Sequence, residues 1–369
     1  MSHILAGTIN GEPFLYMVIG LSIIIAMVLV LPFTFKIIEK NLEPFFLLMG
    51  ILAVTISGLW SWDLVLEALK APVTIGNIPI GIFQAVLIFG ILLFYFNEKF
   101  CNFIANIEER IGLRIFIFLL VIILGLISSI VSVIVASVLL SEIIAALPLD
   151  RKNRIRLVVL TCFAVGLGAV LTPLGEPLST MLVRKLATPP FYAGFSFSFT
   201  HFAVYVIPGI TVIAFFASIW IGRKVTTAAQ ENKSENSDNI RRVILRAIRV
   251  YLFVAALVLL GEGLKPLIVW YFTKIPAFAF FWINSLSAVL DNATLTTVEI
   301  SATMSIYQIM GIIMGLLIAG GMLIPGNILN IVTAGRLKIS MKEWAVIGVP
   351  IGFALMTTYF LILLPILFK

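Results

Sequence analysis

The sequence predicts an all-α polytopic membrane protein in which two inverted repeats each carry a re-entrant hairpin and a broken transmembrane helix. Of its 369 residues, 61% are hydrophobic and only 12% are charged, and the apolar residues form several runs long enough to cross a bilayer. An apolar hairpin, followed by an apolar segment that proline and glycine interrupt, occurs twice. In such a chain the net charge of +7 indicates basic cytoplasmic loops and not nucleic-acid binding.

Residues 1–77 are expected to form an N-terminal scaffold. Two spans are predicted at about residues 14–35 and 44–60. The first lacks the basic residues that precede the apolar core of a signal peptide, so we interpret it as a true span. Residues 61–77 place acidic and basic side chains on an otherwise apolar pattern, which is typical of a helix lying in the membrane interface.

Residues 78–222 are predicted to form the first repeat. Its expected elements are a span, a hairpin, a broken crossing and a second span, at about residues 78–96, 114–150, 155–186 and 201–221. The hairpin segment is too long for one span and short for two, and basic residues flank both of its ends, so both ends should face the cytoplasm. The motif Thr-Pro-Leu-Gly-Glu-Pro at residues 172–177 marks the break, because two prolines and a glycine cannot continue a helix.

A basic cytoplasmic linker is predicted at residues 223–249, and residues 250–369 are predicted to form the second repeat. Its elements follow the same order, with a span, a hairpin, a broken crossing and a last span at about residues 251–268, 270–300, 305–334 and 344–368. Here the motif Leu-Ile-Pro-Gly-Asn marks the break.

The two hairpins align in sequence, and so do the two breaks. With the Ser-containing hairpin tips superposed, Glu142 falls on Glu299, and these two acids have either a shared role or water-facing and packing positions. At the breaks, the pair at residues 175–176 falls on the pair at residues 326–327. A unit of hairpin and broken helix therefore occurs twice.

The distribution of basic residues predicts the topology. With the N-terminus outside, 19 of the 25 Lys and Arg residues fall in inside connectors and 6 fall outside. The C-terminus is then outside as well, the first hairpin enters from inside, and the second enters from outside. This is the inverted arrangement of many secondary transporters, which bind substrate near the midplane between their repeats.

The stretch at residues 285–297 places an acid, an amide and several hydroxyls within apolar sequence. An ionisable side chain at that depth marks a functional site, the alternative being that Asp291 lies in a water-facing loop. We expect the hairpin tips and the breaks to meet and form an ion-binding site from Asp291, Asn292, Thr294, Ser287, Glu176, Thr172, Ser132, Ser137 and Asn327. Asp291 and Asn292 are the expected sodium ligands, because hard cations take oxygen ligands.

The two acids of this set, Asp291 and Glu176, indicate how transport is coupled. Burial and a neighbouring like charge both favour the protonated form of a carboxyl group. A proton and a cation would therefore compete for these groups, which is antiport chemistry. No cofactor is expected beyond the transported sodium ion.

These motifs resemble those of the ion transporter superfamily over about residues 78–369. The resemblance rests on Ser-x-x-x-Asp-Asn-Ala-Thr at the second tip and on the two break motifs, and the Asp-Asn pair is most similar to that of NhaD-type sodium/proton antiporters and related predicted cation transporters. It implies an elevator-type transporter, commonly a homodimer, in a prokaryotic-type plasma membrane. By the resemblance, Asp291 and Asn292 match the Asp-Asn pair, and Glu176 matches the polar position of the first break. The first tip departs, since residues 135–137 lack the Asn that arsenite and dicarboxylate carriers usually have.

The sequence therefore predicts a secondary antiporter that exchanges a monovalent cation, expected to be sodium, for protons. Its expected partners are membrane lipids, the cation, the proton and a second copy of the chain, and no nucleic acid is expected among them. No enzymatic activity is expected. A sodium-coupled anion carrier of the dicarboxylate or arsenite type is the alternative, because helix N-termini and hydroxyls also bind anions. A membrane aspartyl protease needs two aspartates at depth, and only Asp291 is predicted there. A channel is disfavoured by the inverted broken helices.

Overall fold

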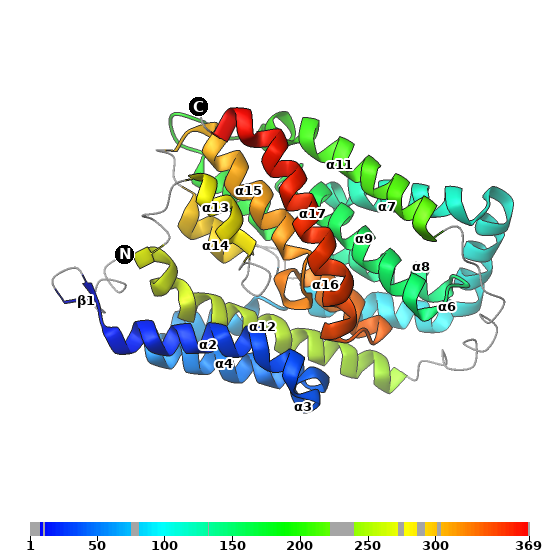
Figure 1. Cartoon of the computed structure of the whole chain (residues 1–369). Helices are drawn as coiled ribbons and strands as arrows, with labels where there is room; N and C mark the ends of the chain where they lie inside the picture. The colour runs from blue at the N-terminus through cyan, green and yellow to red at the C-terminus, as the bar shows by residue number, and fades with distance from the viewer. Residues whose placement is uncertain are drawn as a thin grey trace.

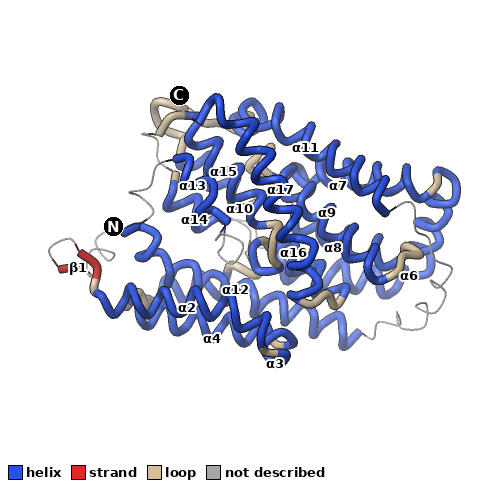
Figure 2. The backbone as a smooth tube through the Cα atoms, viewed as in Figure 1, coloured by secondary structure: helices blue, strands red, loops and turns tan. Residues whose placement is uncertain are grey.

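The chain folds as a helical protein whose only strands, in the part described, are two short ones near the N-terminus (Figures 1 and 2). The computed structural model describes residues 8–9, 12–74, 81–131, 133–221, 240–271, 277–285, 292–300 and 304–367. Within these ranges, five helices are long and apolar enough to cross a membrane, at Leu15–Thr34, Leu113–Val131, Phe197–Ile221, Val243–Leu267 and Met341–Pro365. The predicted class of helical integral membrane protein is therefore supported.

The N-terminal part consists of β1 (Thr8–Ile9), β2 (Glu12–Pro13), α2 (Leu15–Thr34), α3 (Lys36–Lys40), α4 (Leu42–Ser57) and α5 (Trp62–Lys70). The helices α2, α4 and α5 match the two spans and the amphipathic helix predicted there. Gly58 ends α4 with a φ of +67°, a left-handed conformation that glycine adopts without steric cost. Ser61 then caps α5, because its Oγ accepts a hydrogen bond from the Leu64 amide at 3.1 Å.

The middle of the chain forms α6 (Ile82–Ile111), α7 (Leu113–Val131), α8 (Val133–Ala146), α9 (Arg151–Ala169), α10 (Pro177–Lys185) and α11 (Phe197–Ile221). The break predicted between α9 and α10 is confirmed. The segment predicted to form a hairpin consists of two helices that contact each other, and α7 is by itself long and apolar enough to cross a membrane. The helix α6 covers the span predicted at about residues 78–96 and continues beyond it to Ile111. It does so because Asn97–Ile111 alternates apolar and charged residues at helical spacing.

The last part forms α12 (Ile240–Tyr271), α13 (Ala277–Ile283), α14 (Asn292–Glu299), α15 (Ile306–Gly320), the 3-10 turn η4 (Ile324–Gly326), α16 (Ile328–Leu337) and α17 (Met341–Leu367). The predicted break between α15 and α16 and the last span are confirmed. The last residues of the predicted basic linker are helical, since α12 begins at Ile240 and its first turns carry Arg241, Arg246 and Arg249.

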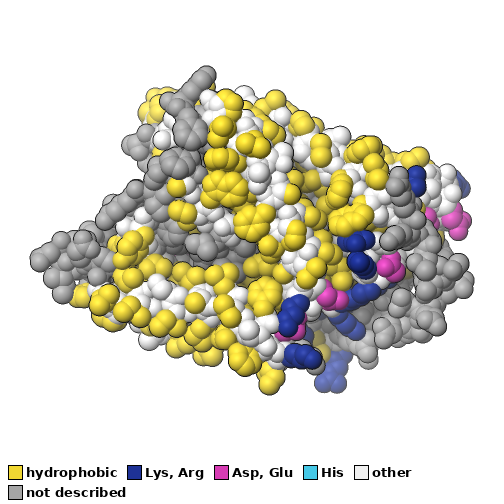
Figure 3. Space-filling model, in the orientation of Figure 1, with side chains coloured by type: hydrophobic (Ala, Val, Ile, Leu, Met, Phe, Trp, Pro, Cys, Tyr) yellow, Lys and Arg dark blue, Asp and Glu magenta, His cyan; other side chains and the backbone are white. Residues whose placement is uncertain are grey.

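The core lies around α9 and α15, whose residues are almost all buried. The helices α7 and α11 pack against α9, while α13 and α17 pack against α15. The helix α8 packs against α16, and α14 packs against α10. On the outer surface, apolar side chains are spread over much of the face seen in Figure 3, while the charged side chains visible there gather in its right half. Many large apolar side chains are exposed, as expected of a protein that faces lipid.

The helix α12 packs mainly against α4. Two glycines permit this contact. A Cβ atom at Gly50 would lie 2.9 Å from the Ala256 carbonyl oxygen, and one at Gly263 would lie 2.6 Å from the Ala53 side chain. The helices α2, α4, α5 and α12 thus form a group beside the helices that carry the breaks (Figure 1).

Candidate functional site

Each of the two broken helices restarts in the same way. Glu176 precedes α10 and Asn327 precedes α16, both with extended backbone (φ −153° and −151°). Pro177 occupies the first turn of α10, where its missing N–H costs nothing. Before α16, the Asn327 Oδ1 atom accepts a hydrogen bond from the Leu329 amide at 3.1 Å and caps the helix. The breaks therefore leave unpaired helix ends inside the protein, which is uncommon unless other groups satisfy them.

Side chains from the restarted helices satisfy the carbonyl groups that the breaks expose. The Ser179 hydroxyl donates to the Ala169 carbonyl at 3.0 Å. The Asn330 Nδ2 atom donates to the Gly320 and Leu323 carbonyls, both at 2.8 Å. The sequence separates Ser179 from Asn330 by the same interval as Glu176 from Asn327. Sequence reasoning missed Ser179, although the alignment of the breaks would have found it.

Hydrogen bonds join the tip of the first hairpin to the segment that breaks the first broken helix. The Val133 amide donates to the Gly175 carbonyl at 2.9 Å, and the Thr172 hydroxyl donates to the Ser129 carbonyl. A Cβ atom at Gly168 would lie 1.7 Å from the Gly125 carbonyl oxygen, so only glycine lets α7 and α9 approach this closely. The predicted meeting of this hairpin tip with the break is therefore observed.

A small cavity of about 20 Å³ lies between the two breaks. Its lining comes from both halves of the chain and consists of Val133, Glu176, Pro177, Leu178, Asn292, Gly326, Asn327 and Ile328. A space that holds one water molecule needs about 10–15 Å³. The cavity thus admits one water-sized particle, and it brings together three of the predicted site residues, namely Glu176, Asn292 and Asn327.

The polar groups around this cavity are buried. Glu176 and Asn292 are 6% and 5% exposed. Within the described residues, neither Oδ1 nor Nδ2 of Asn292 has a hydrogen-bond partner, and the same holds for Oδ1 of Asn330. Both amides lie beside Gly320, where a Cβ atom would be 2.5 Å from the Asn292 Nδ2 atom. Buried polar atoms without partners are costly and point to a ligand or water at this place.

The remaining predicted site residues divide into two groups. Ser137 is buried in α8 and donates its hydroxyl to the Ile134 carbonyl at 2.6 Å, so it does not line the cavity. Thr172 ties the break to the hairpin as described above. Asp291, Ser287 and Ser132 lie outside the described residues, as does the side chain of Thr294. In the part of the chain that is described, no group of three or more His, Cys, Asp or Glu side chains could hold a metal ion.

The two acids that align in sequence, Glu142 and Glu299, have different surroundings. Glu142 accepts hydrogen bonds from Arg336 at 2.5 and 2.8 Å, and Arg246 lies 3.9 Å away. Glu299 is 4% exposed and is hydrogen-bonded to the Asn284 side chain. The alignment predicted that the two positions correspond, but it could not predict that only one of them has a cationic partner.

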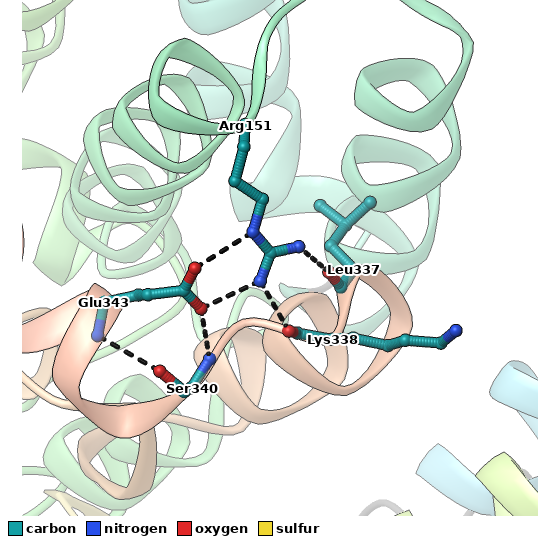
Figure 4. Close-up of polar contacts among 5 residues, drawn as sticks. All are labelled: Arg151, Leu337, Lys338, Ser340 and Glu343. Carbon is teal, nitrogen blue, oxygen red and sulfur yellow. Dashed lines mark hydrogen bonds and ion pairs between the residues drawn. The ribbon is translucent and has the colours of Figure 1, made fainter. Parts of the chain in front are cut away.

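A second ion pair joins α9 to α17 (Figure 4). Arg151 donates to Glu343 through Nε at 3.0 Å and Nη2 at 2.8 Å, and to the Leu337 and Lys338 carbonyls that end α16. Arg151, Arg336 and Arg246 are three of the 19 basic residues counted in the predicted inside connectors. The structure places the ends of the segments that carry them close together at one end of the molecule.

Comparison with known proteins gives one family match. Residues 18–366 match the family described as Protein of unknown function (DUF1646). No curated protein matches the chain.

Proposed function

The chain belongs to the DUF1646 family, and we propose that it is a secondary active transporter that exchanges a monovalent cation, sodium, for protons across the membrane. The observation that carries the proposal is the cavity between the two breaks, which is lined by a buried carboxyl group, a buried amide and the turn at Gly326–Asn327. Hard cations are bound by such oxygen atoms, and broken helices in transporters supply them near the midplane.

The size of the cavity suits a small cation better than a dicarboxylate. About 20 Å³ admits one water-sized particle, such as a dehydrated sodium ion. A dicarboxylate has several times as many atoms and would need a larger space. The unpartnered Oδ1 atom of Asn292 is an acceptor that a cation can use, and the buried carboxyl of Glu176 supplies the negative charge. Asp291, which precedes Asn292 in sequence, is the second carboxyl of the proposed site.

The packing of the helices supports the proposed inverted repeats. Several contacts in one half have a counterpart in the other. The helix α7 packs on α9 as α13 packs on α15, α6 packs on α8 as α12 packs on α14, and α11 packs on α9 as α17 packs on α15. The crossed contacts of α8 with α16 and of α10 with α14 complete the correspondence. A pseudo-symmetric pair of units around a central site is the architecture of many secondary transporters.

We further propose an elevator-type motion, in a homodimer, with both termini outside the cell. In this proposal the helices that carry the breaks move as one unit past the group of α2, α4, α5 and α12. The close packing of α4 on α12 supports the assignment of these helices to a static scaffold. The basic segments gathered at one end of the molecule support the cytoplasmic assignment of that end.

A flux assay in proteoliposomes tests the proposal. Vesicles with an acidic interior and a pH-sensitive dye should become alkaline inside when sodium is added outside, and potassium and lithium are compared with it. Glu176→Gln should abolish the response, because an amide cannot exchange a proton for a cation. Glu109→Gln removes an exposed carboxyl on α6 and is the matched control, which should behave as wild type. A wild-type protein that moves protons with none of the three cations would refute the proposal.

A further inference from the structure

Glu142 has a cationic partner, whereas Glu299 has none among the described residues, and this difference leads to an inference beyond the ion site. The two acids occupy aligned positions on α8 and α14, and these helices make corresponding contacts, α8 with α16 and α14 with α10. On the first interface, Arg336 of α16 neutralises Glu142 through two hydrogen bonds. On the second, α10 ends in Arg184 and Lys185, whose side chains are exposed, and no described cation forms an ion pair with Glu299.

The other helices packed against α14 form no ion pair with Glu299 among the described residues. The arginines of α12, which are Arg241, Arg242, Arg246 and Arg249, lie in its first turns, where Arg246 is 3.9 Å from Glu142. The helix α12 carries Glu262 and Lys265, which pair with each other at 2.9 Å. The helix α15 contains no Asp, Glu, Lys, Arg or His. The N-terminal end of α10 adds Glu176, a further acid. Glu299 is thus a buried carboxyl group whose described surroundings hold no free positive charge.

The immediate contacts of Glu299 are those of a neutral acid. Its Oε2 atom is buried without a hydrogen-bond partner among the described residues. Its other contact is the side chain of Asn284, which is 2% exposed and donates to the Ile312 carbonyl at 3.2 Å. A charged carboxylate in such a place is costly, whereas a protonated carboxyl is tolerated.

We propose that Glu299 is a second proton-binding site, which takes up one proton from water on one side of the membrane and releases it on the other during exchange. This inference rests on the proposed function and adds a group outside the cavity to it. The helix α14 links the two places, since Asn292 of the cavity stands at its N-terminal end and Glu299 at its C-terminal end. At a rise of 1.5 Å per residue, Asn292 and Glu299 are about 10 Å apart along the helix. A shift of this short helix on cation binding would therefore also move the carboxyl group of Glu299.

Two measurements on the full chain test the inference. The first is infrared difference spectroscopy of the membrane-embedded protein between acidic and alkaline pH, without any transport. A carboxyl band of the wild type should be lost in Glu299→Gln and retained in Glu109→Gln. The second compares sodium-for-sodium exchange at equal pH with sodium uptake driven by a pH gradient. Glu299→Gln should keep the exchange within about twofold and lose gradient-driven uptake by about tenfold or more.

The outcomes separate this inference from the proposed function. If wild-type protein moves sodium against protons and Glu299→Gln keeps gradient-driven uptake, or keeps the carboxyl band, Glu299 is not a proton site. If wild-type protein moves no sodium, the proposed function fails and the role of Glu299 in exchange fails with it. Should Glu299→Gln not fold, Glu299→Asp keeps a carboxyl on a shorter side chain and should shift the pH profile of uptake. An unshifted profile in that variant would overturn the inference.

Discussion

Glu142 and Arg336 form a two-point ion pair across 194 residues of sequence, with Oε1 2.5 Å from Nε and Oε2 2.8 Å from Nη2. The carboxylate belongs to the second arm of the first hairpin and the guanidinium to the end of the second broken helix. Both side chains are largely buried, and Arg246 of α12 lies 3.9 Å from the same carboxylate. The pair therefore joins the two halves of the chain and brings them against α12 at one end of the molecule.

Removing one partner of this pair should destabilise the protein more than removing both. Glu142→Leu leaves a buried guanidinium without its carboxylate, which costs about 3–5 kcal/mol, whereas replacing both partners of a buried pair by apolar residues is often close to neutral. Thermal unfolding of purified protein should thus rank wild type and Glu142→Leu/Arg336→Leu above Glu142→Leu. An additive loss in the double variant would show that the two side chains are not coupled.

The amide of Asn330 should contribute more to the stability of its break than the hydroxyl of Ser179 does. Asn330 satisfies two carbonyl groups and Ser179 one. A buried carbonyl left without a donor costs about 1–3 kcal/mol. Asn330→Ala should therefore lower the unfolding temperature more than Ser179→Ala. Gly335→Ala is a suitable control on α16, because nothing lies within 4 Å of the added methyl group. Equal effects of the first two substitutions would contradict this account.

A membrane-impermeant reagent should reach the connector beside the second hairpin from the side of the membrane opposite to that from which it reaches the connector beside the first. Single cysteines at Lys152 and Lys274, in a chain whose Cys101 and Cys162 are replaced by Ser, report on the two connectors. Lys152 is exposed at the start of α9, and Lys274 lies outside the described residues. An impermeant maleimide applied to intact cells should label the variant at Lys274 alone. Labelling of both positions from the same side would rule out the inverted arrangement.

The sequence predicted those features that depend on local chemistry. The prolines and glycines at residues 172–177 and 323–327 cannot continue a helix, so both breaks lie where they were predicted. Glu176, Asn292 and Asn327, which were predicted to meet where the breaks and hairpin tips come together, line one cavity. The sequence did not predict that α6 would continue to Ile111, because charged residues at helical spacing can extend a helix as readily as they can end a span.

Features that depend on packing between distant segments were not predicted. Nothing local to Glu142 indicates Arg336, since the contact arises only when α8 lies on α16. Ser137 was predicted to face the ion, but a serine within a helix can donate to the carbonyl one turn earlier, and it does so here. Whether such a hydroxyl faces an ion or donates to a backbone carbonyl depends on the tertiary structure and not on the spacing of residues along the chain.

The central claim, that a cation and protons compete for the carboxyl groups at the breaks, is tested most directly by equilibrium binding of radioactive sodium to purified protein as a function of pH. If one proton displaces one sodium ion, the apparent Kd for sodium should rise about tenfold for each unit by which the pH falls on the acidic side. Glu176→Gln and Asp291→Asn should each weaken binding and flatten this dependence, while Glu109→Gln should leave it unchanged. A sodium affinity that does not vary with pH, or that survives in both variants, would contradict the account.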